Sequence, residues 1–224
     1  MAVNVRRRLV AFGLAGTLGL ALGGCSVNVP DPTAQKPSPS ESTPATPTIT
    51  PGHDAAAVAA KDLPLGSGAS LVAGEPVTIA SRLEEVPGWT LTRSAMQGES
   101  RYTKSDGCVV DSRVSINQGP LVVAGDDAAS TKALFQYLDA GIDVSRLKPA
   151  TLRWGQDTDQ PRRTVELLAL KSPAASGGKA ALVLARLFSG PASSVFVSIV
   201  CADDAALAKA TADVQAQLVV IPPA

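Results

Sequence analysis

Apolar and polar residues alternate with a period of two along several short segments of the chain, a pattern typical of half-buried β-strands. The segments with this pattern are Val77–Ala80, Trp89–Ser94, Ser100–Lys104, Val109–Ile116, Arg163–Leu170, Ala180–Phe188 and Val195–Cys201. The last three follow one another through glycine-containing turns at Gly177-Gly178 and Gly190-Pro191. Consecutive strands joined by such short turns predict an antiparallel meander.

Two further segments begin with a pair of aspartates and continue with apolar residues at helical spacing. Asp126-Asp127 precedes an apolar face of Leu134, Phe135, Leu138 and Ile142, and Asp203-Asp204 precedes one of Leu207, Thr211, Val214 and Leu218. Carboxylates are favourable in the first turn of a helix because they accept hydrogen bonds from its free N–H groups. The pattern therefore predicts an α+β domain with an antiparallel sheet of about six to seven strands and two main flanking helices.

The first 24 residues differ in character from the rest of the chain. Arg6, Arg7 and Arg8 form a positive start, and residues 9–24 are apolar and rich in glycine. This apolar stretch is shorter than the roughly 20 residues that a membrane-spanning helix requires. A basic start followed by a short apolar stretch is typical of a secretory signal peptide.

The end of this segment resembles a bacterial lipobox. Leu22, Gly23 and Gly24 stand directly before Cys25, the position that receives diacylglycerol in a lipobox. The resemblance implies a signal peptide over residues 1–24 and a membrane anchor on Cys25, with the protein at the extracytoplasmic face of the cell membrane. Two acyl chains supply the double signal that stable anchoring needs. The alternatives are an ordinary cysteine behind a cleavable signal and retention of residues 9–24 as an anchor.

Residues 25–64 are rich in proline, serine and threonine. This segment contains eight of the 17 prolines of the chain. Such a composition buries too little apolar surface to offset the entropy lost on ordering. We therefore expect a disordered linker over residues 25–64 and a single extracytoplasmic domain over residues 65–224.

Charge and composition exclude two classes of function. Lys and Arg number 20, as do Asp and Glu, so the chain is not a strongly basic nucleic-acid-binding protein. One histidine and three cysteines are too few for a His-rich or Cys-rich metal site. We expect neither a metal nor a cofactor.

The cysteines that remain after lipidation of Cys25 are Cys108 and Cys201, and both fall in or beside predicted strands. An even pair of cysteines in an exported domain predicts a disulfide, because the compartment is oxidising. The alternative is a reactive thiol. Neither a CxxC motif nor a nearby histidine is present to activate one.

The sequence predicts no catalytic residue. His53 lies in the expected linker, so triads that depend on a histidine base have none. The carboxylate pairs that could act without histidine are Glu84-Glu85, Asp126-Asp127, Asp157/Asp159 and Asp203-Asp204. Two of these pairs are typical of helix starts and one of a turn. The two tryptophans, Trp89 and Trp154, are interpreted as core residues, the alternative being a carbohydrate-stacking cleft.

Several short motifs resemble a known family. They are Pro87-Gly88-Trp89, Arg186 with the Gly190-Pro191 turn, the strand Ser194–Cys201 and an alanine-rich terminal helix ending in Val219-Val220. Together they resemble the small mycobacterial-type (actinobacterial) lipoproteins of the LpqN/LpqT kind, whose domain is Mog1/PsbP-like. The resemblance implies a curved antiparallel sheet with flanking helices, no established catalytic site and protein contacts at the cell envelope. Cys108 and Cys201 depart from the family pattern, so no partner and no binding residue is carried over.

These observations favour a non-enzymatic lipoprotein that acts in protein interaction or envelope assembly. One alternative is a carrier that binds a lipid or small apolar solute between sheet and helices, which requires an enclosed apolar cavity. Another is a histidine-free carboxylate hydrolase, which requires carboxylates that converge in a cleft.

Overall fold

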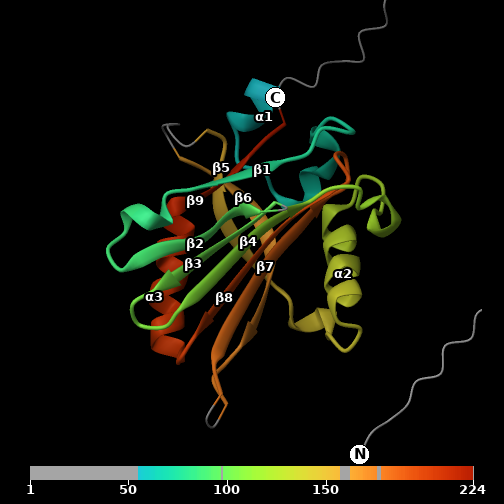
Figure 1. Cartoon of the computed structure of the whole chain (residues 1–224). Helices are drawn as coiled ribbons and strands as arrows, with labels where there is room; N and C mark the ends of the chain where they lie inside the picture. The colour runs from blue at the N-terminus through green and yellow to red at the C-terminus, as the bar shows by residue number, and fades with distance from the viewer. Residues whose placement is uncertain (1–54, 97, 157–161, 176–177, 224) are drawn as a thin grey trace, which may run out of the picture. The chain divides into compact units, whose positions relative to one another are not determined.

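The computed structural model describes residues 55–96, 98–156, 162–175 and 178–223. Within these ranges the chain is α+β, with one nine-stranded sheet in the order β1-β9-β5-β6-β7-β8-β4-β3-β2 (Figure 1). The strands are β1 (Thr78–Ser81), β2 (Trp89–Met96), β3 (Glu99–Lys104), β4 (Val109–Ser115), β5 (Lys148–Trp154), β6 (Arg163–Ser172), β7 (Ala180–Phe188), β8 (Ser193–Cys201) and β9 (Leu218–Ile221). Neighbouring strands are antiparallel except β9 and β5, which are parallel.

The described residues form three α-helices and four short 3-10 turns. The α-helices are α1 (Ala55–Ala59), α2 (Asp127–Leu138) and α3 (Asp204–Gln217), and the 3-10 turns are η1 (Leu65–Ser70), η2 (Leu83–Glu85), η3 (Gly119–Leu121) and η4 (Val144–Arg146). Both expected helix starts are confirmed. The Asp126 carboxylate accepts from the N–H of Ala129 at 2.8 Å, and Asp203 accepts from Ala206 at 2.7 Å.

The number of strands was underestimated, because β5 and β9 were not expected. The helix expected to include Leu218 ends at Gln217, and the mostly β-branched run that follows pairs with β1 on one side and β5 on the other. This pairing buries Leu218, Val219 and Val220 almost completely, so sheet formation wins over continuation of the helix. In β5, only the last residues are buried, and the strand opens with the polar, proline-containing pair Lys148-Pro149.

The expected apolar face of the first helix is also partly wrong. Leu134 and Phe135 are buried, but Leu138 is 41% exposed at the last position of α2. Ile142 lies beyond the helix and packs partly against the same cluster. The backbone N–H of Asp139 closes the last turn on the carbonyl of Phe135 at 3.1 Å, which ends the helix before Ile142.

The inner face of the curled sheet holds the larger part of the core. Inward residues of most strands pack against Leu207, Ala210 and Val214 of α3. The rings of Trp154 and Phe188 stack there, with centroids 6.3 Å apart. Burial of these apolar side chains is the main source of stability for a domain of this size.

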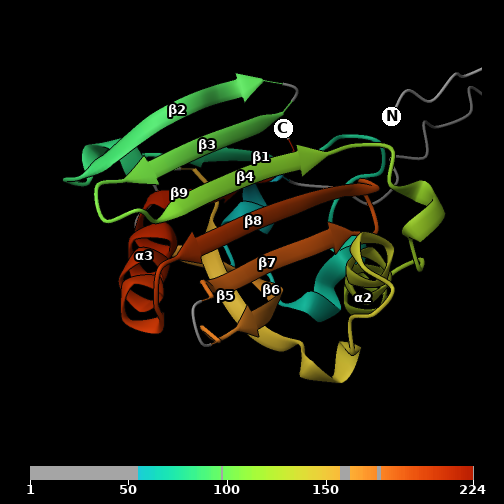
Figure 2. The same cartoon turned by 60° about the horizontal axis from the view of Figure 1, so that its bottom comes forward.

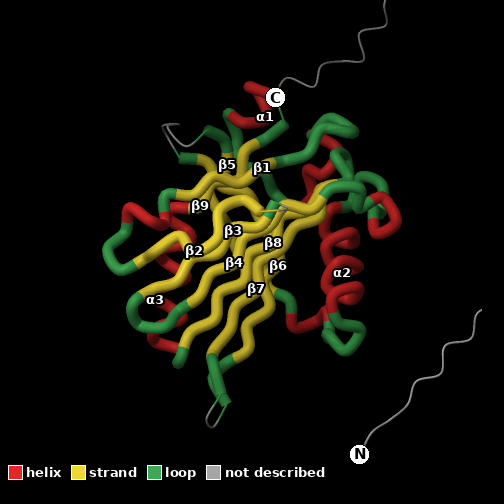
Figure 3. The backbone as a smooth tube through the Cα atoms, viewed as in Figure 1, coloured by secondary structure: helices red, strands yellow, loops and turns green. Residues whose placement is uncertain are grey.

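The outer face of the sheet is only half covered. There α2 contributes Leu134 and Phe135 to a second cluster with Leu168, Ala185 and Leu187 of β6 and β7. Figure 3 shows α2 and α3 on opposite sides of the strands. Among the described residues, no helix packs over the outer faces of β2, β3 and β4 (Figure 2).

Residues 61–64, which their composition assigned to the linker, lie against the sheet. Leu63 is 3% exposed and forms a parallel bridge with Val165 of β6. Its N–H donates to the carbonyl of Thr164 at 2.8 Å, and its own carbonyl accepts from the N–H of Glu166 at 3.0 Å. The ladder between β6 and β7 stops at Leu168, so the start of β6 is available for this contact.

A fully buried ion pair fixes this junction. The guanidinium of Arg186 in β7 donates to Asp127 Oδ2 through Nε at 2.8 Å, and its Nη2 lies 2.7 Å from the same oxygen in the ion pair. Its remaining donors reach three main-chain carbonyls, those of Leu63 (2.9 Å), Glu166 (3.0 Å) and Pro64 (3.0 Å). Four hydrogen bonds and the ion pair with Asp127 therefore hold the guanidinium. Burial lowers the pKa of the Arg186 guanidinium, and the Asp127 carboxylate opposes this shift.

Candidate functional site

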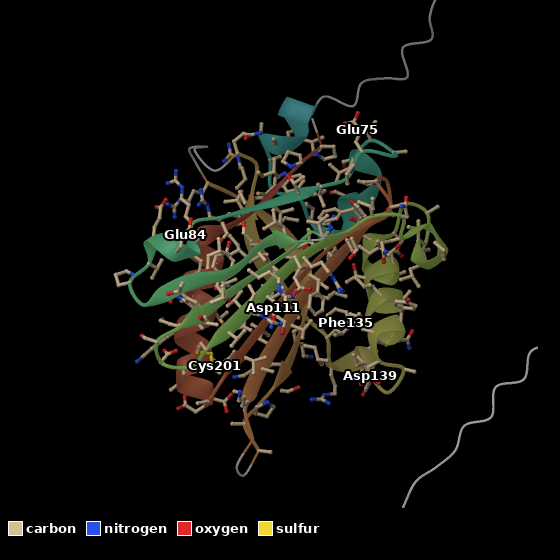
Figure 4. All side chains as sticks on the ribbon, in the orientation of Figure 1. Glu75, Glu84, Asp111, Phe135, Asp139 and Cys201 are labelled. Atoms are coloured by element: carbon tan, nitrogen blue, oxygen red, sulfur yellow. A yellow bond between two sulfur atoms is a disulfide. The ribbon has the colours of Figure 1, made fainter. Side chains whose placement is uncertain are left out.

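The uncovered half of the outer face contains a hollow of about 200 Å³. Six outward side chains line it, two from each of three neighbouring strands: Glu99 and Arg101 on β3, Asp111 and Arg113 on β4, and Phe196 and Ser198 on β8. Alternation along each strand aims these residues outward while their neighbours face the core. Asp111 marks this region in Figure 4.

Two cross-strand ion pairs engage the carboxylates of the hollow. Arg101 holds Asp111 with two parallel bonds, Nε to Oδ1 at 2.5 Å and Nη2 to Oδ2 at 3.1 Å. Arg93 of β2 donates from Nη1 to Glu99 Oε1 at 2.7 Å. The hydrogen bond to Asp111 raises the pKa of the Arg101 guanidinium. Exposed pairs of this kind add little stability, but they fix the geometry of the side chains.

Arg113, unlike Arg93 and Arg101, forms no ion pair with a carboxylate in the described structure. It lies opposite Glu99 on one side and Phe196 on the other in the strand register, and its guanidinium carbon is 5.4 Å from the centre of the Phe196 ring. Its Nε is buried and has no hydrogen-bond partner in the described structure. Two arginines and two carboxylates line the hollow, and Arg93 lies beside it on β2. With Arg93 counted, three arginines face two carboxylates, and the cluster around the hollow carries one positive charge in excess.

Sequence reasoning did not identify this site. Its signal is the alternation of charge at a spacing of two, Glu99 with Arg101 and Asp111 with Arg113, on strands that pair with each other. Phe196 comes from a strand more than 80 positions later, so only the fold brings it to the same place.

A second hollow, of about 240 Å³, lies where α1 and η1 meet. Val58, Lys61, Leu63 and Ser70 are among the residues that line it. It opens at the surface and mixes polar with apolar side chains. It therefore differs from the enclosed apolar cavity that a carrier requires.

Cys108 and Cys201 are joined by a disulfide whose Cα atoms are 4.2 Å apart. Both side chains are fully buried. The bridge links the residue before β4 to the last residue of β8, immediately ahead of α3. The residues that resemble a lipobox, Leu22, Gly23, Gly24 and Cys25, lie outside the described residues, as does His53.

The tryptophans are core residues, as interpreted from the sequence. Trp154 is 1% exposed, and its Nε1 donates to the carbonyl of Val58 at 3.3 Å. Trp89 is 5% exposed, and its Nε1 donates to Asp213 of α3 at 2.9 Å. Neither ring is open for stacking on a sugar.

Most of the described carboxylates considered for catalysis have structural partners. Asp126 and Asp203 cap their helices, and Asp127 is bound to Arg186. Asp204 pairs with Lys171 at 3.1 Å. The pair Glu84-Glu85 lies in η2, and Asp157 and Asp159 are outside the described residues. None of the described pairs lines either hollow.

Asp213 connects α3 to β2 and β3 at the edge of the sheet. Besides Trp89, it accepts from Lys104 Nζ at 2.7 Å, and that ammonium lies 5.2 Å from the centre of the Trp89 ring. Partial burial acts to raise the pKa of the Asp213 carboxyl, but the hydrogen bonds from Lys104 and Trp89 outweigh it and the pKa is lowered.

This lowered pKa predicts a pH dependence of stability. A carboxylate with a lower pKa in the folded than in the unfolded protein stabilises the fold above its unfolded pKa of about 4 and loses this contribution as the pH falls through the folded value. Asp213→Asn should therefore lower the free energy of unfolding at pH 7 by about 1–3 kcal/mol, and the difference from wild type should shrink below about pH 4. Urea unfolding followed by tryptophan fluorescence, at pH 7 and below about pH 4, measures both. Glu75→Gln, an exposed carboxylate labelled in Figure 4, is the matched control and should change neither.

No protein-family model matches the chain, and no curated protein matches it. In the part of the chain that the structure describes, no helix has both the length and the apolar character needed to cross a membrane.

Proposed function

We propose that the protein is a non-enzymatic lipoprotein, anchored through diacylglycerol on Cys25, that acts at the extracytoplasmic face of the membrane in protein interaction or envelope assembly. The observation that carries the interaction part is the uncovered outer face of β2, β3 and β4 with its charged hollow. The lipobox residues Leu22, Gly23 and Gly24 support the anchor.

We also propose that the domain is of the Mog1/PsbP-like kind. The curled, mostly antiparallel sheet with one helix on each face is compatible with the Mog1/PsbP-like domain of the LpqN/LpqT-type lipoproteins that the motifs around Trp89 and Arg186 resemble. Such a domain at the end of a proline-rich linker presents a surface at a distance from the membrane.

Two features favour interaction over the alternatives. The inner face, where a carrier would hold an apolar ligand, is packed with fully buried side chains such as Trp154, Phe188 and Leu184 together with α3. Of the described carboxylates in these pairs, all but Glu84 cap a helix or form an ion pair, which favours structural over hydrolytic roles.

The anchor is tested by Cys25→Ser. The protein should move from the membrane fraction to the soluble fraction or persist as an unprocessed precursor, because no diacylglycerol can be attached. Fractionation and the mass of the mature N-terminus measure this. Ser38→Ala, a substitution in the expected linker that leaves the lipobox and the Cys108–Cys201 disulfide intact, is the control. Membrane retention and normal maturation of the Cys25 variant would contradict the anchor.

The interaction role is tested by photo-crosslinking in intact cells. A photoreactive residue at Thr103, which lies next to Arg101 on the outer face, should yield a discrete adduct with another envelope protein. The same residue at Lys209, exposed on α3 at the other side of the sheet, is the control. Equal adducts from both positions, or none from Thr103, would overturn the role of the outer face.

A further inference from the structure

We infer that the hollow on the outer face receives the carboxylate of an acidic side chain from a partner protein, and that Arg113 binds it. This inference rests on the proposed interaction function and names its contact chemistry. It follows from the charge balance of the hollow, the state of Arg113 and the size of the space.

The charge balance leaves one arginine for a ligand. Asp111 accepts both of its bonds from Arg101, and Glu99 accepts from Arg93, although Glu99 lies opposite Arg113 in the strand register. The carboxylates of the cluster are therefore engaged by other cations. An incoming carboxylate restores neutrality without breaking either pair.

Arg113 is prepared for this role. Stacking on Phe196 holds the guanidinium in place, so less side-chain freedom is lost when a ligand binds. Its buried Nε has no hydrogen-bond partner in the described structure, which places the group partly out of water before any ligand arrives. Charge-assisted bonds to an arginine are strongest where water is already excluded.

The size and surroundings of the hollow indicate a single side chain. About 200 Å³ is less than the roughly 300–1,000 Å³ of a small-molecule pocket, and the site is open on the face of a sheet. Ser198 adds a hydroxyl to its lining. The chain without residues 1–24 has 17 basic and 20 acidic residues, so this positive spot stands out on an acidic protein. It therefore selects acidic groups on a partner by charge.

The arrangement predicts opposite effects from two substitutions in the same hollow. Arg113→Gln removes the binding cation and should weaken binding of an acidic peptide about tenfold or more. Asp111→Asn frees Arg101 from its partner and leaves two unpaired guanidinium groups, so it should strengthen binding several-fold. A general loss of structure would weaken binding in both variants.

The experiment uses the full chain, purified in detergent and labelled with 15N-arginine. The probes are acetyl-Ala-Glu-Ala-amide and its neutral isostere acetyl-Ala-Gln-Ala-amide. The Nε–H resonance of Arg113, assigned by its absence in Arg113→Lys, should shift saturably with the glutamate peptide at about millimolar concentration and not with the glutamine peptide. Arg146→Gln, which removes an exposed arginine of η4 away from the hollow, should bind like wild type.

Three results would overturn the inference. They are equal binding of the two peptides, equal loss in Arg113→Gln and Arg146→Gln, and binding of free acetate as tight as that of the glutamate peptide. If one of them is found while the Thr103 crosslink persists, the contact chemistry is wrong and the interaction function stands. Loss of the crosslink as well would overturn both the contact chemistry and the interaction function.

Discussion

Replacing Asp127 by asparagine should lower the free energy of unfolding by about 3–5 kcal/mol, because it leaves Arg186 buried without its counter-charge. Both side chains are fully buried, and Asp127 Oδ1 also accepts from the backbone N–H and the hydroxyl of Ser189 at 2.8 Å and 2.6 Å. The substitution therefore weakens contacts to β7 and to the turn that follows it. Urea unfolding at pH 7 measures the loss.

A double substitution separates this network from a simple buried ion pair. Removing both partners of a simple pair is often nearly neutral. Here Arg186→Met with Asp127→Leu should stay destabilised by several kcal/mol. The reason is that the carbonyls of Leu63, Pro64 and Glu166 lose the guanidinium N–H groups that donate to them. Recovery to wild-type stability in the double variant would contradict the role assigned to these carbonyls. Glu85→Gln, which breaks the exposed pair with Arg82, should cost less than about 1 kcal/mol and is the control.

The same network makes residues 61–64 part of the domain. Leu63 is a single apolar residue in a polar, proline-containing stretch, so composition alone assigned it to the linker. Its burial depends on the interrupted ladder between β6 and β7 and on Arg186, which is 123 positions away. Sequence patterns reflect local periodicity and give no information about such a distant partner.

The strands and helix starts were predictable for local reasons. Alternation identifies β2, β3, β4 and β7 because one face of each strand packs on the core. The aspartate caps at Asp126 and Asp203 follow from the free N–H groups of a first turn. In contrast, the run Leu218–Ile221 is apolar throughout, and periodicity cannot tell whether such a run continues a helix or forms a strand between two others.

The charged hollow illustrates the same limit. Each of its strands could be predicted, but the pairing of β4 with β8, which brings Phe196 beside Arg113, is a property of the sheet order. Arg113 remains unpaired because Glu99, which lies opposite it in the strand register, forms its ion pair with Arg93 of β2. A candidate site of this kind therefore appears only once the topology is known.

After the ion pair of Asp127 and Arg186, the disulfide should make the second large contribution to stability. It joins residues separated by 93 positions, and closing a loop of that length stabilises a folded domain by about 4–5 kcal/mol in the chain-entropy account. Cys108→Ala, Cys201→Ala and the double variant should all lose this contribution, measured by urea unfolding with the mass of the intact protein as a check on the thiols.

The pattern of the three losses tests the bond itself. Either single substitution breaks the bridge, so the double variant should be only slightly less stable than each single one. Two independent buried thiols would instead give losses that add. Reductant offers a matched condition, since both cysteines are fully buried and their bridge is open to exchange only when the domain unfolds. Wild type in reductant should therefore keep its folded-state fluorescence, and after one cycle of unfolding it should refold with the stability of the double variant. Additive losses in the variants, or the same midpoint for oxidised and reduced wild type, would show that the two sulphur atoms do not support the fold as a bond between β4 and β8.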